Sequence, residues 1–221
     1  MKWDIVFVQN TISFLFLVMV FLQLIFRRKK LGKKIGYFII AMVVIVLANT
    51  ISFGYRIFID QLNSTPIFVV LVNGIGFLFF FLYYYNLQKI KKVKILQGVI
   101  IGIFVTGYIL YGLLSKDFFI KFPSYSYFLE CILLIISITM FFYETFNSDI
   151  ILNITKYFPF WVSLSLIIIY IGLLPILLFI NRVNSNLSAE TFHLILFLIN
   201  IIGYSVLFYG ILKSNKINYE R

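Results

Sequence analysis

Six polar residues interrupt long apolar stretches of this 221-residue sequence and are the first candidates for chemistry. Polar and ionisable side chains inside an apolar stretch are unfavourable there, so they often mark binding sites or ion pathways. If these six side chains converge, they form a polar pocket within an apolar protein. The ligand-binding candidates are Asn49, Arg56, Asn73, Glu130, His193 and Asn200.

Glu130 is the strongest of these candidates because it lies well inside its apolar stretch. A carboxylate that faces lipid is unfavourable, so we expect Glu130 to face the interior. There it would pair with Arg56 or His193, or be protonated. The other candidates have structural alternatives: asparagines can join helices through hydrogen bonds, and Arg56 and His193 can extend to the outer surface.

Several kinds of chemistry have no residues to support them. Cys131 is the only cysteine, which excludes a disulfide within the chain and a cysteine-based zinc site. The isolated Cys131 and His193 argue against a metal centre, and we expect no cofactor. No paired carboxylates and no serine, histidine and aspartate set lie within reach of one another, so we do not expect an enzyme.

The candidates belong to a strongly apolar chain. It is 62% hydrophobic and only 12% charged, about half the charged fraction of soluble domains. Seven apolar segments are each long enough to cross about 30 Å of hydrocarbon as a helix. We therefore predict an all-α polytopic membrane protein, a seven-helix bundle in which residues 1–221 form one transmembrane domain. The predicted helices lie near 5–26, 36–58, 67–87, 95–115, 125–144, 160–181 and 191–213.

Lysine and arginine predict the orientation of the seven segments, because cytoplasmic loops are enriched in these residues. The side with loops 27–35, 88–94 and 145–159 and the C-terminus holds 14 of the 19, and the other side holds 5. We therefore predict an outer N-terminus and a cytoplasmic C-terminus, in a bacterial cytoplasmic membrane. The net charge of +11 then indicates contact with anionic lipids and requires no nucleic acid.

A weak internal repeat links the third and seventh segments. Residues 71–77 read LVNGIGF and residues 198–204 read LINIIGY, with four identical positions at an offset of 127. A parallel repeat of three helices, with the fourth as linker, is one of the schemes found in carriers. Chance is the alternative, because short apolar sequences align easily.

The sixth segment has an aromatic start and an internal proline. Phe158, Phe160 and Trp161 are predicted interfacial anchors, since aromatic rings prefer the headgroup level. Pro175 cannot donate to the carbonyl of Ile171, so we predict a hinge there. Before this segment, apolar residues of 147–158 recur on one side, a pattern typical of a short amphipathic helix on the inner leaflet or against a partner.

Four motifs in the C-terminal half resemble those of a family of small, uncharacterised bacterial membrane proteins with seven helices. The motifs are Phe141-Phe142-Tyr143-Glu144, Phe160-Trp161-Val162, Tyr170-Ile171-Gly172 and Asn200 with Tyr204. Relatives often carry an acidic residue where this chain has Gly76. Members are often encoded beside sensor histidine kinases, so the resemblance implies a signalling role and a cytoplasmic kinase or other signalling protein as partner. It supplies no catalytic residues.

Two function classes remain. The first is a receptor-like signalling subunit that binds a small apolar or lipid-like ligand between helices and acts through a cytoplasmic partner. The second is a small-solute transporter of the 3+1+3 type. The longest expected loop, residues 145–159, is too short for a soluble catalytic domain, so either function would lie within the helices or on short loops.

Overall fold

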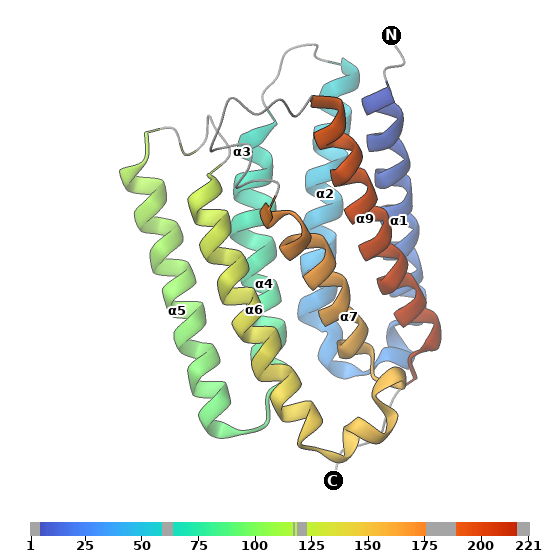
Figure 1. Ribbon diagram of the computed structural model, residues 1–221, viewed down its shortest axis with the longest axis vertical. Coiled ribbons are helices and arrows are strands. Elements are labelled where there is room, and N and C mark those ends of the chain that lie inside the picture. The colour runs from blue at the N-terminus through green and yellow to red at the C-terminus, as the bar shows by residue number, and fades with distance from the viewer. Residues whose placement is uncertain (1–4, 59–63, 117, 119–122, 176–188, 216–221) are drawn as a thin grey trace. The chain divides into compact units, whose positions relative to one another are not determined.

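The structure, a computed structural model, describes residues 5–58, 64–116, 118, 123–175 and 189–215. All regular secondary structure in these ranges is helical (Figure 1). The helical elements are α1 (Ile5–Leu31), η1 (Lys33–Ile35), α2 (Gly36–Phe58), α3 (Thr65–Ile67), η2 (Phe68–Gly76), α4 (Phe77–Leu87), α5 (Lys91–Leu114), α6 (Ser124–Phe146), η3 (Asp149–Lys156), α7 (Phe158–Leu166), η4 (Ile167–Ile171) and α9 (Ala189–Lys213).

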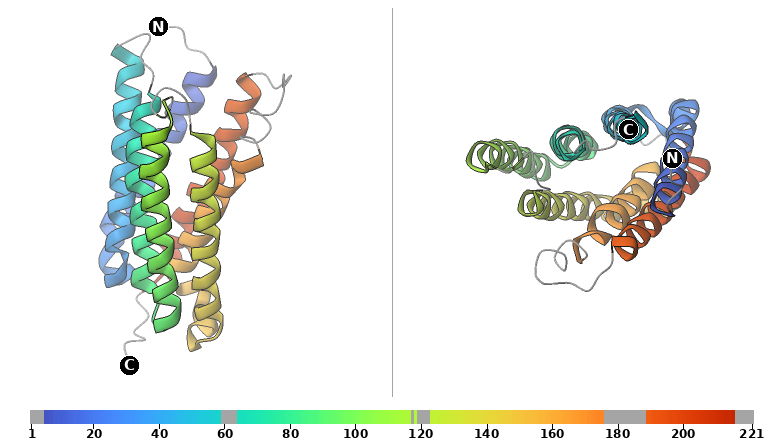
Figure 2. Two further views of the ribbon diagram at one scale, coloured as in Figure 1. Left: turned by 90° about the vertical axis from the view of Figure 1, so that its left-hand side faces the viewer. Right: turned by 90° about the horizontal axis from the view of Figure 1, so that it is seen from above.

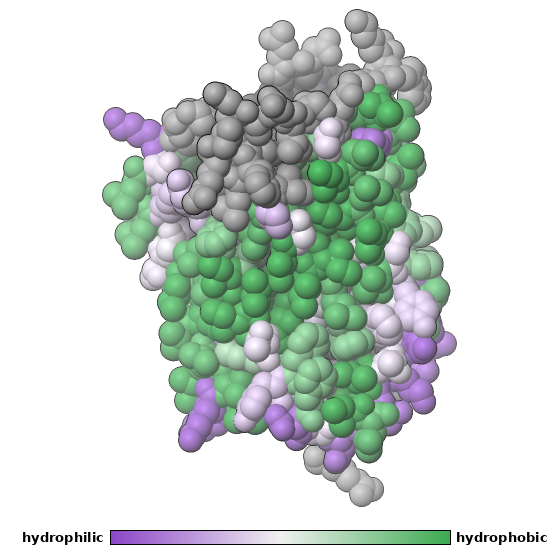
Figure 3. Space-filling view, in the orientation of Figure 1, coloured by the Kyte–Doolittle hydropathy of each residue, from purple (hydrophilic) through white to green (hydrophobic). Residues whose placement is uncertain are grey.

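These elements confirm the predicted membrane helices. Six helices within the described ranges are long and apolar enough to cross a membrane, or seven if the pair η3 and α7–η4, bent by 70°, forms one span. The end of the predicted segment 160–181 lies outside the described residues. On the side of α5 and α6 seen in Figure 3, apolar residues cover the middle and hydrophilic residues lie toward the ends. The chain is therefore a multi-pass helical membrane protein.

The chain divides into two compact units. The three-helix unit combines residues 1–31 with 154–221, and the four-helix unit comprises residues 32–153. The first span thus groups with the sixth and seventh, whereas the predicted repeat groups spans one to three and five to seven. The internal repeat and the orientation stay predictions.

In the three-helix unit, α9 lies between α1 and α7 and packs against both (Figure 2). Glycines of α9 allow η4 and α7 to approach closely, since a Cβ at Gly203 would collide with Ile169 of η4 and one at Gly210 with Trp161 of α7. The Ser165 hydroxyl also donates to the carbonyl of Gly203 at 2.9 Å. Small residues at the contact and one hydrogen bond between helices are how apolar helices associate in a membrane.

The C-terminal end of α9 is held by a side chain from α1. Arg27 Nη1 donates to the carbonyl oxygens of Ile211 and Leu212, at 2.9 and 2.6 Å. The last carbonyls of a helix have no partners in the helix itself and carry partial negative charge. A guanidinium group donates hydrogen bonds to these carbonyls and carries the opposite charge, so Arg27 fixes α1 to the end of α9.

In the four-helix unit, α4 is the central helix, with contacts to α2, α5 and α6. Its sequence, FLFFFLYYYNL, is almost wholly aromatic and aliphatic, and most of its side chains are buried. Gln97 of α5 is fully buried beside it. Its amide nitrogen donates to the carbonyl of Phe81 at 3.3 Å and to the Ser137 hydroxyl at 3.0 Å, and its oxygen accepts from Gln88 Nε2 at 3.3 Å. This network joins α4, α5 and α6.

Glu144, near the end of α6, binds the turn between α4 and α5. Its two carboxylate oxygens accept from the backbone N–H groups of Lys89 and Ile90, at 3.0 and 3.1 Å. These two residues come directly before α5, so Glu144 ties the end of α6 to the turn between α4 and α5.

The third span is not a uniform α-helix, because η2 is a π-helical segment of nine residues. The Tyr108 hydroxyl of α5 donates to the carbonyl of Val69 at 2.8 Å and lies against the Cα of Gly74. A side chain at Gly74 would occupy the place of the tyrosine ring. The glycine and the tyrosine together stabilise a helical form that is rare and frequent at functional sites. The sixth span contains a second such segment, η4.

Candidate functional site

Glu130 of α6 is a deeply buried ionisable group of the four-helix unit. Its side chain is 1% exposed. Oε1 accepts a hydrogen bond from the Ser126 hydroxyl, one helical turn earlier, at 2.9 Å. Oε2 is buried and has no hydrogen-bond partner. The structure thus places Glu130 in the interior, as the sequence predicts, with half of its hydrogen-bonding capacity unused.

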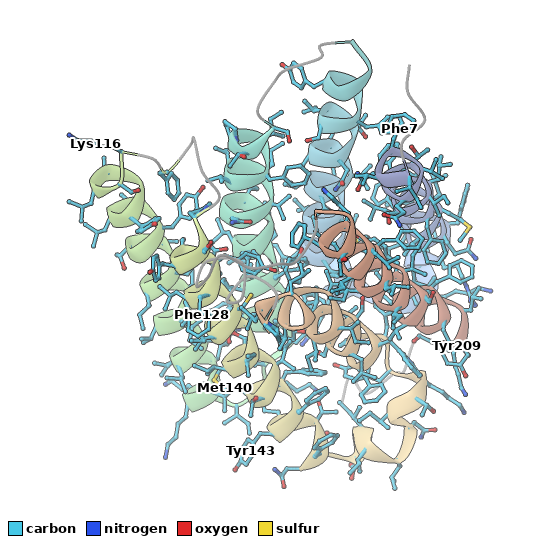
Figure 4. The ribbon with its side chains drawn as sticks, turned by 45° about the horizontal axis from the view of Figure 1, so that its top comes forward. Phe7, Lys116, Phe128, Met140, Tyr143 and Tyr209 are labelled. Atoms are coloured by element: carbon cyan, nitrogen blue, oxygen red, sulfur yellow. The ribbon has the colours of Figure 1, made fainter. Side chains whose placement is uncertain are left out.

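The buried side of α6 that carries Glu130 differs sharply from its outer side. Ser126, Glu130 and Ser137 recur at helical spacing and are all buried. Phe128 and Tyr143, labelled in Figure 4, are 40% and 61% exposed. This separation of polar residues inside from apolar residues outside is the reverse of a soluble helix and is what a lipid-facing helix requires.

Aromatic rings form a connected cluster around this part of the unit. Neighbouring ring centroids lie between 5.0 and 6.2 Å apart. Tyr127 is three residues from Glu130 on the buried side of α6, and the Tyr108 hydroxyl is close enough to the Glu130 carboxyl for electrostatic interaction. We call this set the aromatic cluster: Phe77, Phe81, Phe104, Tyr108, Phe118 and Tyr127.

Asn73 is another of several buried polar groups without full pairing, which in the described part of this unit also include Ser52 and Gln88. It lies in the π-helical segment η2, is 2% exposed, and its Nδ2 has no acceptor. Phe77, four residues later, contacts Tyr127 with a centroid distance of 6.1 Å. Buried polar groups of native proteins are nearly always paired, with protein or with ordered water. Asn73 and Glu130 therefore mark places where a water or a ligand is needed.

The remaining predicted ligand-binding residues fall in different places. Asn49 is half-buried on α2, and its Nδ2 donates to the carbonyl of Ile45 in its own helix at 2.8 Å. Arg56 belongs to α2, but its side chain lies outside the described residues. His193 and Asn200 are half-buried on α9 in the three-helix unit. The four-helix unit thus holds Asn49, Arg56, Asn73 and Glu130, and the predicted convergence of all six stays a prediction.

The predicted anchors and hinge lie in the three-helix unit. Phe158 is buried, whereas Phe160 and Trp161 are half-buried. Trp161 Nε1 donates to the carbonyl of Thr155 at 2.9 Å, which ties the start of α7 to the end of η3. Pro175 is exposed and follows η4. The predicted amphipathic segment contains η3, whose Ile151 and Leu152 are exposed.

Two residues that form hydrogen bonds between helices, Gln97 and Tyr108, were not predicted from the sequence. Gln97 had a signal, because an amide within an apolar segment on the same face as Ile100 and Phe104 should be buried. Tyr108 had none, since tyrosine is common in membrane helices. In the described part of the chain, no group of three or more histidine, cysteine, aspartate or glutamate side chains could hold a metal ion.

Comparison of the chain with models of known protein families gave no match, and neither the curated proteins nor the solved structures gave one. The class of the protein, a multi-pass helical membrane protein, therefore rests on its own helices and their composition.

Proposed function

We propose that the protein is a receptor-like sensory subunit of a bacterial cytoplasmic membrane. It binds a small ligand inside the four-helix unit and acts through a cytoplasmic signalling partner. One observation carries the proposal: Asn73 Nδ2 and Glu130 Oε2 are both buried in this unit without partners. A bundle that only had to be stable would satisfy these groups or replace them with apolar side chains.

Within the predicted orientation, this site lies in the outer half of the membrane. The basic loops then lie on the cytoplasmic side, together with η3, where Leu152 is 80% exposed. An exposed apolar side chain in a short amphipathic helix suits either the lipid surface or a docked protein. The resemblance to proteins encoded beside histidine kinases supports a kinase as that partner.

A small-solute transporter is the second candidate, favoured by the two π-helical segments. η2 interrupts the third span and η4 interrupts the sixth. Carriers often build their sites at such irregular spans, and the similarity of residues 71–77 to 198–204 agrees with a repeat. A carrier would use Asn73 and Glu130 to bind its solute rather than to sense it.

The test compares a strain that lacks the protein with strains that express variants of it. For a sensory subunit, the deletion changes a limited set of transcripts, and the wild-type chain restores them. Glu130→Gln and Asn73→Ala should fail to restore them although both reach the membrane in normal amounts. Thr139→Ala, which removes an exposed hydroxyl of α6 that bonds only within its own helix, is the control and should restore them.

Full restoration by Glu130→Gln would remove the interior site from the proposed function. A transporter gives a different result: the deletion changes the distribution of a solute between cells and medium, and the phosphorylation of the partner kinase stays constant.

A further inference from the structure

Among the side chains that the structure describes, the Glu130 carboxyl has no cationic partner. Its one hydrogen bond comes from the neutral Ser126 hydroxyl at 2.9 Å, and its second oxygen is buried and unpaired. No lysine, arginine or histidine among the residues that the structure describes forms an ion pair with it. An ionised carboxylate inside a membrane protein normally pairs with a positive group or faces a water-filled cavity.

The aromatic cluster reaches Glu130 through Tyr127, which lies three residues earlier on the buried side of α6. Phe77 meets Tyr127 edge to face at 6.1 Å, and Phe81 lies 5.0 Å from Phe104. Phe118 meets Tyr108 edge to face at 5.3 Å. Aromatic faces carry partial negative charge and attract cations that approach within about 6 Å of the ring centroid. The attraction is strongest where water is excluded.

We propose that Glu130 and the aromatic cluster bind a small lipophilic organic cation, such as a quaternary ammonium or phosphonium compound. This inference deepens the proposed function and rests on it for the position of the ligand site. The carboxylate supplies the opposite charge, and the rings supply an apolar surface whose faces also favour positive charge. A bound cation would stabilise the ionised form of Glu130 by pairing with it. An anion would be repelled by that form, and a neutral molecule of the same shape would leave it unpaired.

Charge selectivity is therefore the distinguishing property of this site. Apolar burial alone would favour any molecule of the right size, whatever its charge. Glu130 adds an electrostatic interaction energy that is favourable for a cation and unfavourable for an anion of equal shape. A cation that enters from the outer side would also be favoured by the inside-negative membrane potential.

The experiment measures direct binding of three probes of similar shape to the purified full-length chain in an uncharged detergent. The probes are tetraphenylphosphonium, neutral triphenylphosphine oxide and tetraphenylborate, each measured alone by equilibrium dialysis. We expect saturable binding of the phosphonium cation that is at least about tenfold tighter than that of the other two probes.

Two variants assign this selectivity to the carboxylate. Glu130→Gln keeps the shape of the side chain and should weaken phosphonium binding by at least about tenfold, to the level of the neutral probe. Thr139→Val, a change of similar size on the exposed side of α6, should bind as the wild type does. If Glu130→Gln does not fold, Glu130→Asp replaces it and should keep the preference for the cation.

Absence of saturable phosphonium binding, equal affinity for all three probes, or undiminished binding by Glu130→Gln would each overturn the inference. The results also distinguish a failure of this inference from a failure of the proposed function. If no cation binds but Glu130→Gln still fails to restore the transcripts, the receptor role stands with another ligand. If the cation binds through Glu130 but Glu130→Gln restores the transcripts, the cation site stands without the receptor role.

Discussion

The two units of this protein use opposite kinds of interior. In the three-helix unit, the seam between α7 and α9 is built from glycines that receive the side chains Ile169 and Trp161 without space for a methyl group. In the four-helix unit, large rings fill the core, and polar side chains lie among them. The first kind of packing joins backbones closely. Both units leave some buried polar atoms unpaired, including Gln9, Asn10 and Ser214 in the first, but among the described residues only the second leaves a carboxyl oxygen unpaired, that of Glu130.

This difference shows how a membrane protein can separate stability from binding. Lipid is as apolar as leucine, so helices gain stability from close packing and hydrogen bonds rather than from burial itself. The seam of α9 obtains both from Gly203, Gly210 and Ser165. In the four-helix unit, Gln97 and Glu144 form hydrogen bonds that join helices. Asn73 and Glu130 keep unpaired polar atoms that could bind a ligand.

The largest expected loss of stability is at Gly203 and Gly210, where α9 contacts η4 and α7. Gly203→Ala and Gly210→Ala should each lower the free energy of unfolding by roughly 1–3 kcal/mol, because Cβ atoms would collide with Ile169 and with the Cβ of Trp161. Thermal unfolding in detergent measures this. Gly102→Ala in α5 is the control, since a Cβ there has no neighbour within 4 Å. If all three variants unfold alike, the contrast between the units is lost.

A smaller effect is expected at the Gln97 network. Gln97→Leu removes three hydrogen bonds, so it should cost about 2 kcal/mol at roughly 0.6 kcal/mol for each bond. Ser165→Ala removes a single bond between helices and should cost about a third as much. Thr106→Val, whose hydroxyl bonds only within its own helix, should have little effect. Equal losses for Gln97→Leu and Ser165→Ala would contradict the idea that the four-helix unit depends more on polar contacts.

The smallest effect is expected at the π-helical segment. Tyr108→Phe removes the donor to the Val69 carbonyl, which should lower stability by roughly 0.6 kcal/mol. It should also speed amide hydrogen exchange across residues 70–76, because the π-helical form loses its support from α5. Tyr111→Phe, one turn further along α5, is the matched control. Unchanged exchange in Tyr108→Phe would show that Gly74 and its neighbours hold the segment without the hydroxyl.

The position of the spans could be read from the sequence because hydrophobicity is a local property. Predicted segments such as 36–58, 67–87 and 125–144 agree with the helices to within a few residues. The burial of Glu130 followed in the same way, since a charge deep in an apolar helix must turn inward. The order of apolar and polar residues in the sequence therefore determined a multi-pass helical membrane protein and the inward position of the Glu130 carboxyl.

The contacts between helices were decided by the tertiary structure. Three hydrogen bonds between helices join residues far apart in the sequence. Tyr108 and Val69 are 39 residues apart, Glu144 and Ile90 are 54 apart, and Arg27 and Ile211 are 184 apart. No local pattern encodes such pairs, because the same apolar sequence can pack on several neighbours with similar energy. The π-helical form of residues 68–76 has the same cause. Its apolar residues suit an ordinary helix equally well, and the bond from Tyr108 and the space at Gly74 select the rarer form.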